Sequence, residues 1–295
     1  MKILLLGGRG QLGFELQRSL VFLGKVLAPD RYLLDLTKKE IVEASLKKIN
    51  PDLIVNAAAW TDVNAAEENE IIARRLNTDL SRQIAEYAFT NNTKVIHYST
   101  DYVYPGGGTE PWDENSPTGP LNVYGQTKLE GDQAIQQSGC KHLIFRTSWV
   151  YSASGNNFMN KIITLAKSKK ELDVVADQFG APTTVRLIAQ LTALSIKTEL
   201  KTGLYNLSSR GETSWYNFAK DILALALQTG ESFKLDPRNI NPIVTSQFST
   251  PARRPLNSRL TISKLEKALN IELPVWSSEL HLTFHEYMKH NLFKL

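Results

Sequence analysis

Glycines at positions 7, 10 and 13 constrain the fold more than any other feature of the chain. Gly7, Gly10 and Gly13 follow an apolar run at residues 2–6 and precede a helical pattern that we expect to begin about Phe14. Glycine is needed where a chain turns tightly, where backbone approaches a pyrophosphate, and where a helix packs closely on a strand. A tight turn alone also explains such spacing. Its place between a strand and a helix predicts a dinucleotide-binding turn, with phosphate at the helix N-terminus.

The first half of the chain alternates short apolar runs with helical patterns. The apolar runs show no polar alternation, which is typical of strands buried on both faces, and they lie at 2–6, 25–28, 52–57, 94–98 and 142–149. We expect helices from Thr37 to before Asn50, over 71–89 and over 123–137. Thr37 and Glu40 have the spacing of a capping box. The repetition predicts an α/β fold with a doubly wound, Rossmann-like parallel sheet.

The regular alternation fades after residue 151. Helical patterns at 158–168, 185–197 and 215–228 mix with short strands at 172–175 and 204–207, and a loop at 250–255 precedes two C-terminal helices. We therefore expect a dinucleotide-binding domain over 1–150, with later segments near 181–215 returning to it. Residues 151–295 would form mainly a smaller, interleaved α/β substrate-binding lobe.

Composition excludes several classes of protein. The 295 residues are 42% apolar and 22% charged, an ordinary globular balance, and the net charge of +4 fits either an anionic substrate or simple solubility. No basic run points to nucleic acid. The single cysteine, Cys140, excludes an intrachain disulfide and a thiolate zinc site. The N-terminal apolar run is too short for a signal peptide, and no stretch reaches the ~18 apolar residues of a membrane span. We expect a cytoplasmic protein without membrane or nucleic-acid partners.

Residues after the predicted strands suggest how the adenosine and nicotinamide ends are bound. Asp30, at the predicted end of the second strand, can bind the ribose hydroxyls and favours NAD, whereas Arg31 can receive the 2′-phosphate of NADP. Both cofactors, NADPH and NADH, stay open, and a solvated turn is the alternative for this pair. Further candidates for the dinucleotide are Asp35 and Leu36 near the adenine, and Ala59, Trp60 and Thr61 near the nicotinamide.

Tyr124 and Lys128 form the predicted catalytic pair. On a helix, positions i and i+4 share a face. A phenol has a pKa near 10, and a nearby ammonium lowers it by stabilising the phenolate. Tyr124 can then give a proton to a carbonyl oxygen while hydride reaches the carbon, and Lys128 would hold the nicotinamide ribose. Thr100, at the end of the fourth strand, would hydrogen-bond the substrate oxygen, and Asp101 would touch the substrate or fix the loop.

These elements together resemble the extended short-chain dehydrogenase/reductase superfamily. Longer motifs resemble, more narrowly, the dTDP-4-dehydrorhamnose reductase family, over nearly the whole chain. They are Tyr98-Ser99-Thr100-Asp101-Tyr102-Val103-Tyr104-Pro105-Gly106, Leu121-Asn122-Val123-Tyr124-Gly125, Phe145-Arg146-Thr147-Ser148-Trp149-Val150-Tyr151, Gly155-Asn156-Asn157-Phe158, Asp177-Gln178-Phe179-Gly180-Ala181-Pro182-Thr183 and Thr250-Pro251-Ala252-Arg253-Arg254-Pro255.

The resemblance implies an activity and a set of contacts. The family reduces the C4 keto group of dTDP-4-dehydro-6-deoxy-L-mannose with NADPH or NADH, giving dTDP-L-rhamnose in the last step of its synthesis. Tyr124 would be the proton donor, and Arg253 and Arg254 would pair with the substrate diphosphate or form a salt bridge between lobes. Carried over by motif, the dinucleotide contacts are Gly10, Gln11, Leu12, Asp30, Asp35, Leu36, Ala59, Trp60 and Thr61, and the substrate contacts are Thr100, Asp101 and Trp149.

Two departures from the family's pattern bear on the active-site loop and on assembly. Asn64 stands where some members carry aspartate. Some members form a magnesium-linked dimer through acidic residues, but the corresponding helix here carries Arg186 and Gln190. A cation cannot gather on such a surface, so we expect no metal site, no dependence on Mg²⁺, and a monomer or weak homodimer.

Other functions of the same fold remain as alternatives. A dehydratase needs an acid–base pair, typically Asp-Glu after the catalytic threonine, and Tyr102 stands in place of that glutamate. Another nucleotide-sugar reductase, or an epimerase that retains its cofactor, is a second alternative. A non-catalytic regulatory subunit with this fold is a third, and intact Tyr124, Lys128 and Thr100 argue against it.

Overall fold

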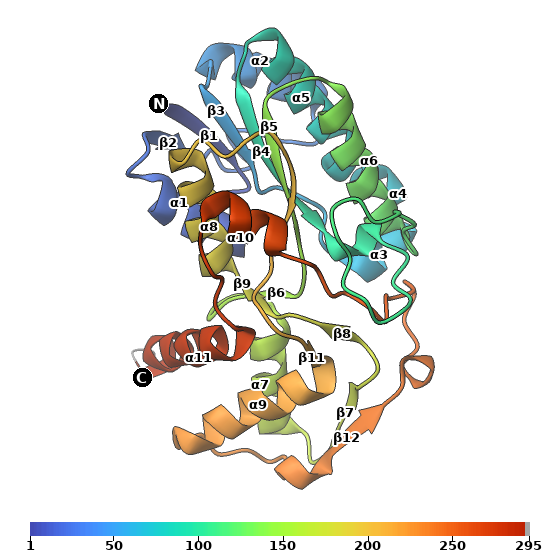
Figure 1. The fold of residues 1–295 in the computed structure, drawn as a ribbon. Helices are drawn as coiled ribbons and strands as arrows, with labels where there is room; N and C mark the ends of the chain where they lie inside the picture. Colours follow the sequence, from blue (N-terminus) through green and yellow to red (C-terminus); the bar gives the residue numbers. More distant parts are fainter. Residues whose placement is uncertain (293–295) are drawn as a thin grey trace.

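A six-stranded parallel sheet forms the centre of the larger part of the molecule (Figure 1). The computed structural model describes residues 1–292. The strands lie in the order β10-β5-β4-β3-β1-β2 and all pair in parallel, which confirms the predicted α/β class. Their bounds are β1 Lys2–Leu6, β2 Lys25–Leu27, β3 Leu53–Asn56, β4 Lys94–Thr100, β5 His142–Thr147 and β10 Gly203–Asn206.

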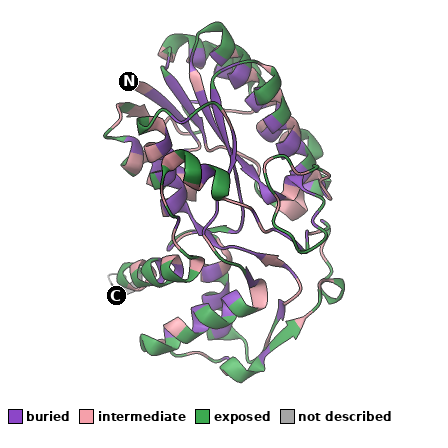
Figure 2. Ribbon diagram, viewed as in Figure 1, coloured by how far each residue is buried: buried purple, intermediate pink, exposed green. Residues whose placement is uncertain are grey.

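Helices cover both faces of this sheet because successive strand residues point to opposite sides. Ile3 and Leu5 pack into one apolar cluster with α1 (Gln11–Leu20), α8 (Val185–Lys197) and α10 (Ser263–Leu269). Leu4 and Leu6 pack into a second cluster with α2 (Lys39–Ile49), α5 (Leu80–Thr90) and α6 (Val123–Gln137). The strands other than β2 are almost wholly buried between these layers (Figure 2). The expectation that the run at 25–28 is buried on both faces is wrong, because β2 is an edge strand and its residues are exposed or half-buried. Helix α8 thus packs on the large sheet and β10 forms one of its edge strands, although both lie late in the sequence.

A smaller lobe contains a third apolar core (Figure 1). Its helices are α7 (Phe158–Ser168), α9 (Trp215–Gln228) and α11 (Trp276–Leu292). Three two-stranded sheets join its segments to one another and to the larger part: β7 (Leu172–Val175) with β12 (Ile240–Ile243), β6 (Val150–Tyr151) with β9 (Thr183–Thr184), and β8 (Phe179–Gly180) with β11 (Thr213–Ser214). Single 3₁₀ turns are η2 (Asp101–Val103), η3 (Pro237–Asn239) and η4 (Thr245–Gln247). No helix of the described residues is long and apolar enough to cross a membrane.

The segment expected as one helix over 71–89 is interrupted. It consists of α4 (Glu70–Arg74), the π-helical turn η1 (Arg75–Asp79) and α5, and a further helix, α3 (Val63–Glu68), precedes it. Within η1, the buried Asn77 donates to the Thr127 hydroxyl at 3.0 Å, and the Thr78 hydroxyl donates to the Thr127 carbonyl at 2.8 Å. The π turn therefore fixes the part of α6 that carries Lys128.

Three of the expected boundaries are wrong in the following ways. Thr37 does not cap a helix: α2 begins at Lys39 without a side-chain cap, because Asp35 accepts both the backbone N–H and the hydroxyl of Thr37. Helix α1 begins at Gln11 rather than about Phe14. The strand expected over 142–149 ends at Thr147, because Trp149 has a φ of 49° in the left-handed region.

The glycine turn lies where the strand order changes direction, between β1 and its neighbours β2 and β3. Gly7 has a φ of 78°, and a Cβ there would lie 2.6 Å from the Ala57 carbonyl oxygen after β3. A Cβ on Gly13 would lie 2.1 Å from the Gly7 carbonyl oxygen. The first glycine therefore allows the close approach of two strand ends, and the last allows α1 to pack against the turn.

Gly13→Ala should lower the free energy of unfolding by about 2 kcal/mol or more, since the added methyl meets backbone that cannot move aside. Gly10→Ala is the matched control. Its Cβ would lie 3.3 Å from the Gly7 carbonyl oxygen and meet no other group, so we expect stability within about 0.5 kcal/mol of the parent. Thermal or urea unfolding measures both variants, and equal stabilities would contradict the packing role given to Gly13.

Candidate active site

A cavity of about 1310 Å³ opens at the carboxyl ends of the parallel strands, where ligands of doubly wound sheets bind. Its lining joins the glycine turn to the segment after β4 and to the start of α6. Most of the expected site residues line it: Gly7, Gly10, Gln11, Leu12, Asp30, Arg31, Asp35, Leu36, Ala59, Thr61, Thr100, Asp101, Tyr124, Lys128 and Trp149. Gly13, Trp60, Arg253 and Arg254 are not part of this lining.

The glycine turn and its helix fit a dinucleotide. The backbone of residues 7–12 forms one wall of the cavity, and α1 begins at Gln11, so the N-terminus of α1 lies at this wall. Trp60 lies outside the lining, and its indole N–H donates to the Asp62 carbonyl at 3.0 Å. Its backbone N–H donates to Asn77 at 2.9 Å, so Trp60 orders the loop after β3.

Asp30 lies three residues beyond the end of β2 and pairs with a cation. Its carboxylate accepts from Arg9 at 2.6 Å and from the backbone N–H groups of Tyr32 and Leu33. Arg31 is exposed and its guanidinium lies over the Tyr32 ring. The end of the cavity near β2 thus carries one carboxylate and two guanidinium groups, a donor and acceptor set that fits the adenosine ribose of either dinucleotide.

Gln11 connects the glycine turn to the smaller lobe. Its amide oxygen accepts from the Ser152 hydroxyl at 2.6 Å and from Asn157 at 3.0 Å, and its amide nitrogen donates to the Asn156 carbonyl at 3.2 Å. The motif Gly155-Asn156-Asn157 is thereby held at the cofactor wall. This contact between distant segments has no signal in the sequence alone.

Tyr124 is partly buried near the start of α6, and Asn122 caps that helix through the Gly125 N–H at 2.8 Å. Burial raises the pKa of the Tyr124 hydroxyl, and a hydrogen bond with Thr100 acts against this rise. The expectation that Lys128 lowers the pKa of Tyr124 is therefore not met in this arrangement. The phenol is held protonated, which suits a proton donor.

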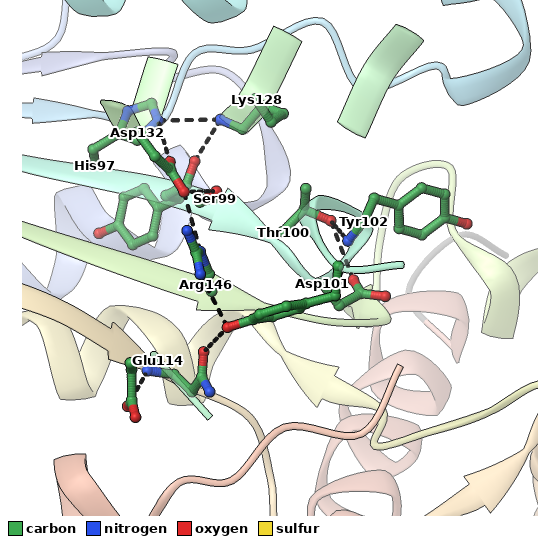
Figure 3. Close-up of polar contacts among 12 residues, drawn as sticks. His97, Ser99, Thr100, Asp101, Tyr102, Glu114, Lys128, Asp132 and Arg146 are labelled. Atoms are coloured by element: carbon green, nitrogen blue, oxygen red, sulfur yellow. Dashed lines mark hydrogen bonds and ion pairs between the residues drawn. The ribbon is translucent and has the colours of Figure 1, made fainter. Parts of the chain in front are cut away.

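Lys128 is buried with 2% exposure and its amine lies against β4. It donates to the Tyr98 carbonyl at 2.5 Å and lies 3.3 Å from Nε2 of His97 (Figure 3). Burial lowers the pKa of Lys128 to about 8, and Asp132 opposes that change. The Lys128 amine thus contacts residues of β4, while Lys128 also lines the cavity.

Asp101 is a buried carboxyl at the edge of the cavity, with 2% exposure. One oxygen accepts from the Thr100 hydroxyl at 3.1 Å, while Oδ2 has no hydrogen-bond partner. Burial raises the pKa of Asp101 to about 7, and a hydrogen bond from Ser258 opposes the rise. An unpaired buried oxygen at a cavity wall is suited to a polar group of a ligand.

Trp149 stacks on Trp215 from α9, with ring centroids 3.6 Å apart and an interplanar angle of 8°. A Cβ at Gly180 would lie 2.7 Å from the Trp149 ring, so only glycine fits there. Both tryptophans line the cavity, and they form an aromatic wall on the side of the smaller lobe.

Arg254 and Arg253 are outside the cavity lining, but Arg254 lies next to Tyr102, which lines the cavity, and Arg253 lies next to Asn122, the cap of α6. The Arg254 guanidinium donates to the amide oxygen of Asn64 at 3.4 Å, and its Nε is buried without a partner. Burial raises the pKa of Tyr102 to about 12, and the positive charge of Arg254 opposes this rise. Arg253 is exposed, and its carbonyl accepts from Asn122 at 2.8 Å. Asn64 therefore contacts Arg254 without supplying a charge.

Arg186 joins the two parts of the molecule. Its guanidinium pairs with Glu15 of α1 at 3.2 Å and with Glu286 of α11 at 2.8 Å. Gln190, one turn later, is exposed. Within residues 1–292 no cluster of three or more His, Cys, Asp and Glu side chains could hold a metal ion.

Some cavity residues were missed by the sequence reasoning. Tyr102 follows Asp101 directly, and its ring meets that of Tyr124 edge-on at 5.6 Å. Asp132 does not line the cavity but is buried one helical turn after Lys128, and this i+4 spacing on α6 could have drawn attention to it. Trp215 carries no such signal, because it reaches the cavity only through the packing of the smaller lobe.

The fold and this site define a dinucleotide-binding oxidoreductase of the short-chain dehydrogenase/reductase type. Residues 1–289 match the family model described as RmlD substrate binding domain. Over 284 residues the chain is 46% identical to the dTDP-4-dehydrorhamnose reductase of Shigella flexneri, with 94% of each chain covered. The chain belongs to the dTDP-4-dehydrorhamnose reductase family.

Solved structures of this family agree in fold. A Bacillus anthracis dTDP-4-dehydrorhamnose reductase in complex with NADP superposes with a TM-score of 0.88 at 34% identity, over 97% of this chain and 100% of that chain. The Clostridium acetobutylicum counterpart gives a TM-score of 0.89 at 32% identity, over the full length of both chains.

Asp101→Asn should stabilise the protein at alkaline pH. The folded-state pKa of Asp101 is raised above the usual value of 3.8, so ionisation costs stability as the pH rises from about 4 through about 7. Removing the charge should recover on the order of 2 kcal/mol above pH 7 and nothing near pH 4. Thermal unfolding of both proteins across this range measures the difference. A gain that is the same at every pH would contradict the assignment.

Proposed function

We propose that Tyr124 donates the proton in the reduction of the C4 keto group of dTDP-4-dehydro-6-deoxy-L-mannose, giving dTDP-L-rhamnose. The observation that carries this proposal is the placement of Thr100, Tyr124 and Lys128 in one cavity with the glycine turn. Membership of the dTDP-4-dehydrorhamnose reductases supplies the substrate class and places the reaction at the end of dTDP-L-rhamnose synthesis.

The reaction needs a hydride and a proton. A reduced dinucleotide, NADPH or NADH, would supply the hydride to the carbonyl carbon when it is bound in this cavity. Tyr124 gives its phenolic proton to the carbonyl oxygen, and the Thr100 hydroxyl stabilises that oxygen by hydrogen bonding. Because burial keeps Tyr124 protonated, the proton stays available until negative charge develops on the substrate oxygen. Lys128, whose amine contacts β4 rather than the Tyr124 hydroxyl, is the residue we assign to the nicotinamide ribose.

Groups around the reacting centre suit a sugar nucleotide. We place the sugar between Asp101, whose free oxygen accepts a hydroxyl, and the indole of Trp149. Arg254, with an unpartnered Nε and a neutral neighbour in Asn64, is the cation we assign to the diphosphate. The pairing of Arg186 with Glu15 and Glu286 supports a metal-independent monomer or weak homodimer.

An epimerase or dehydratase of the same fold is the alternative activity. The dehydratase lacks support because Tyr102 follows Asp101 where the acid–base pair would need glutamate. An epimerase retains its dinucleotide, so protein purified with stoichiometric NAD and inactive as a reductase would favour that reading. Oxidation of NADPH or NADH that depends on the keto sugar and yields dTDP-L-rhamnose supports the reductase.

Tyr124→Phe should lower kcat by about 10²- to 10⁴-fold, because it removes the proton donor and keeps the ring. Affinity for NADPH should stay close to that of the parent, as measured by fluorescence titration. Tyr102→Phe is the matched control, since it removes a neighbouring phenol that has no assigned proton to give. If Tyr124→Phe turned over at the parental rate, Tyr124 would not be the donor.

A further inference from the structure

A buried group of polar and charged side chains lies behind Lys128 (Figure 3). His97 and Ser99 reach it from β4, Arg146 from β5 and Asp132 from α6. His97 is 1% exposed, Asp132 0% and Arg146 4%. Burying ions is costly unless they are paired, so the arrangement of these groups needs a physical reason.

Asp132 is the carboxylate shared by the group. Its Oδ2 accepts from the Ser99 hydroxyl at 2.8 Å and from Nε of Arg146 at 3.1 Å. Its Oδ1 has no hydrogen-bond partner and lies 3.8 Å from Nε2 of His97. Arg146 also donates to the Tyr104 hydroxyl at 3.0 Å. Asp132 thus pairs with Arg146 and keeps one oxygen without a partner, while its negative charge also acts on Lys128, one helical turn earlier.

The contacts of His97 make the charge of Lys128 a balance of two effects. A charged Lys128 amine can only donate, so Nε2 of His97 must accept from it. The neutral imidazole ring then carries its proton on the other nitrogen, Nδ1. The Asn56 amide nitrogen lies 3.2 Å from Nδ1, and its oxygen accepts from the Ala58 N–H at 3.3 Å. This orientation makes Nδ1 an acceptor and puts the ring proton on Nε2, facing the amine. His97 and burial therefore favour a neutral amine, and the negative charge of Asp132 favours a charged one.

We propose that Asp132 is a positioning residue for the reduction: its carboxylate, one helical turn after Lys128, keeps that amine charged and held for contact with the nicotinamide ribose. The proposal rests on the function proposed for Lys128. Without the carboxylate of Asp132, the buried amine loses its counter-charge, and Arg146 loses its ion-pair partner. Lys128 would then lose its proton at a lower pH, and its hold on the ribose would weaken.

Titratable groups on every neighbouring element enter this balance. His97 comes from β4, and Arg146 and His142 come from β5. The negative charge of Asp132 acts to raise the pKa of His142. Tyr104 lies beyond η2 against Arg146. Tyr124 lies on α6, as Lys128 does, and the negative charge of Asp132 also acts to raise the pKa of Tyr124. Asp101 acts on Tyr124 from η2. Only a comparison of variants that differ by one charge isolates Asp132 from this set.

The test compares NADPH affinity as a function of pH in the parent and in Asp132→Asn. In the parent, affinity should fall as the pH rises through the Lys128 pKa of about 8. In Asp132→Asn this fall should begin about one pH unit lower, with near-parental affinity below it. The pH profile of kcat/KM should move in the same direction, because it also reports the free enzyme.

Glu130→Gln is the matched control, because it removes a carboxylate two residues from Lys128 on the same helix. Glu130 contacts Arg74 and Gln126 rather than the buried group, so the alkaline limb should stay in place. If Asp132→Asn leaves Arg146 unpaired and does not fold, Asp132→Asn/Arg146→Gln removes both charges. In this double variant, NADPH affinity should begin to fall at a lower pH than in Arg146→Gln alone.

NADPH titration needs no sugar, so the outcome is independent of the proposed substrate. A parent that binds NADPH but leaves the keto sugar unreduced would contradict the proposed function, and the titration would still test Asp132. An alkaline limb at the same pH in the parent and in Asp132→Asn would overturn the proposal. An equal shift in Glu130→Gln, or an affinity independent of pH in the parent, would also overturn it.

Discussion

The close approach of two strand ends at the glycine turn is the constraint on which the rest of the structure depends. Ala57 donates its backbone N–H to the Leu6 carbonyl at 3.0 Å, and Gly7 lies directly against the Ala57 carbonyl. Any side chain at position 7 would separate β1 from β3 at the point where the strand order changes direction. That junction sets the floor of the cavity, so the position of α1, the loop of Trp60 and the end of β4 all depend on it.

A second constraint is the cost of burying charge beside the reacting groups. Lys128, Asp132 and Arg146 lie between the sheet and α6 with almost no exposure, and each polar contact among them offsets part of the desolvation cost. The π turn at Asn77 and Thr78 holds α6 against this group from the other side. Burial raises the pKa of Tyr124 and lowers that of Lys128, so the same physical cause favours the neutral form of both members of the pair.

The sequence predicted the parallel sheet and the helices on both faces, because periodicity and glycine spacing are local signals. Most of the expected site residues, including those implied by the family resemblance, line the cavity, but they make up less than half of its lining. The sequence did not predict the left-handed conformation of Trp149, since that conformation depends on Trp215 and Gly180, which are distant in sequence. The link from Gln11 to Ser152 and Asn157 escaped for the same reason. The prediction that Thr37 caps a helix was wrong because the Asp35 carboxylate accepts from both the backbone N–H and the hydroxyl of Thr37. This arrangement is an Asx turn, which the capping pattern alone does not exclude.

Direct transfer of hydride to the sugar is the central claim, and isotopic labelling tests it most directly. The enzyme would be supplied with dTDP-4-dehydro-6-deoxy-L-mannose and NADPH that carries deuterium at the transferable position of its nicotinamide, and the product would be examined by NMR. The account predicts dTDP-L-rhamnose with one deuterium at C4 of the sugar and none elsewhere. A product without deuterium at C4, or with the label at another carbon, would contradict reduction at the C4 carbonyl.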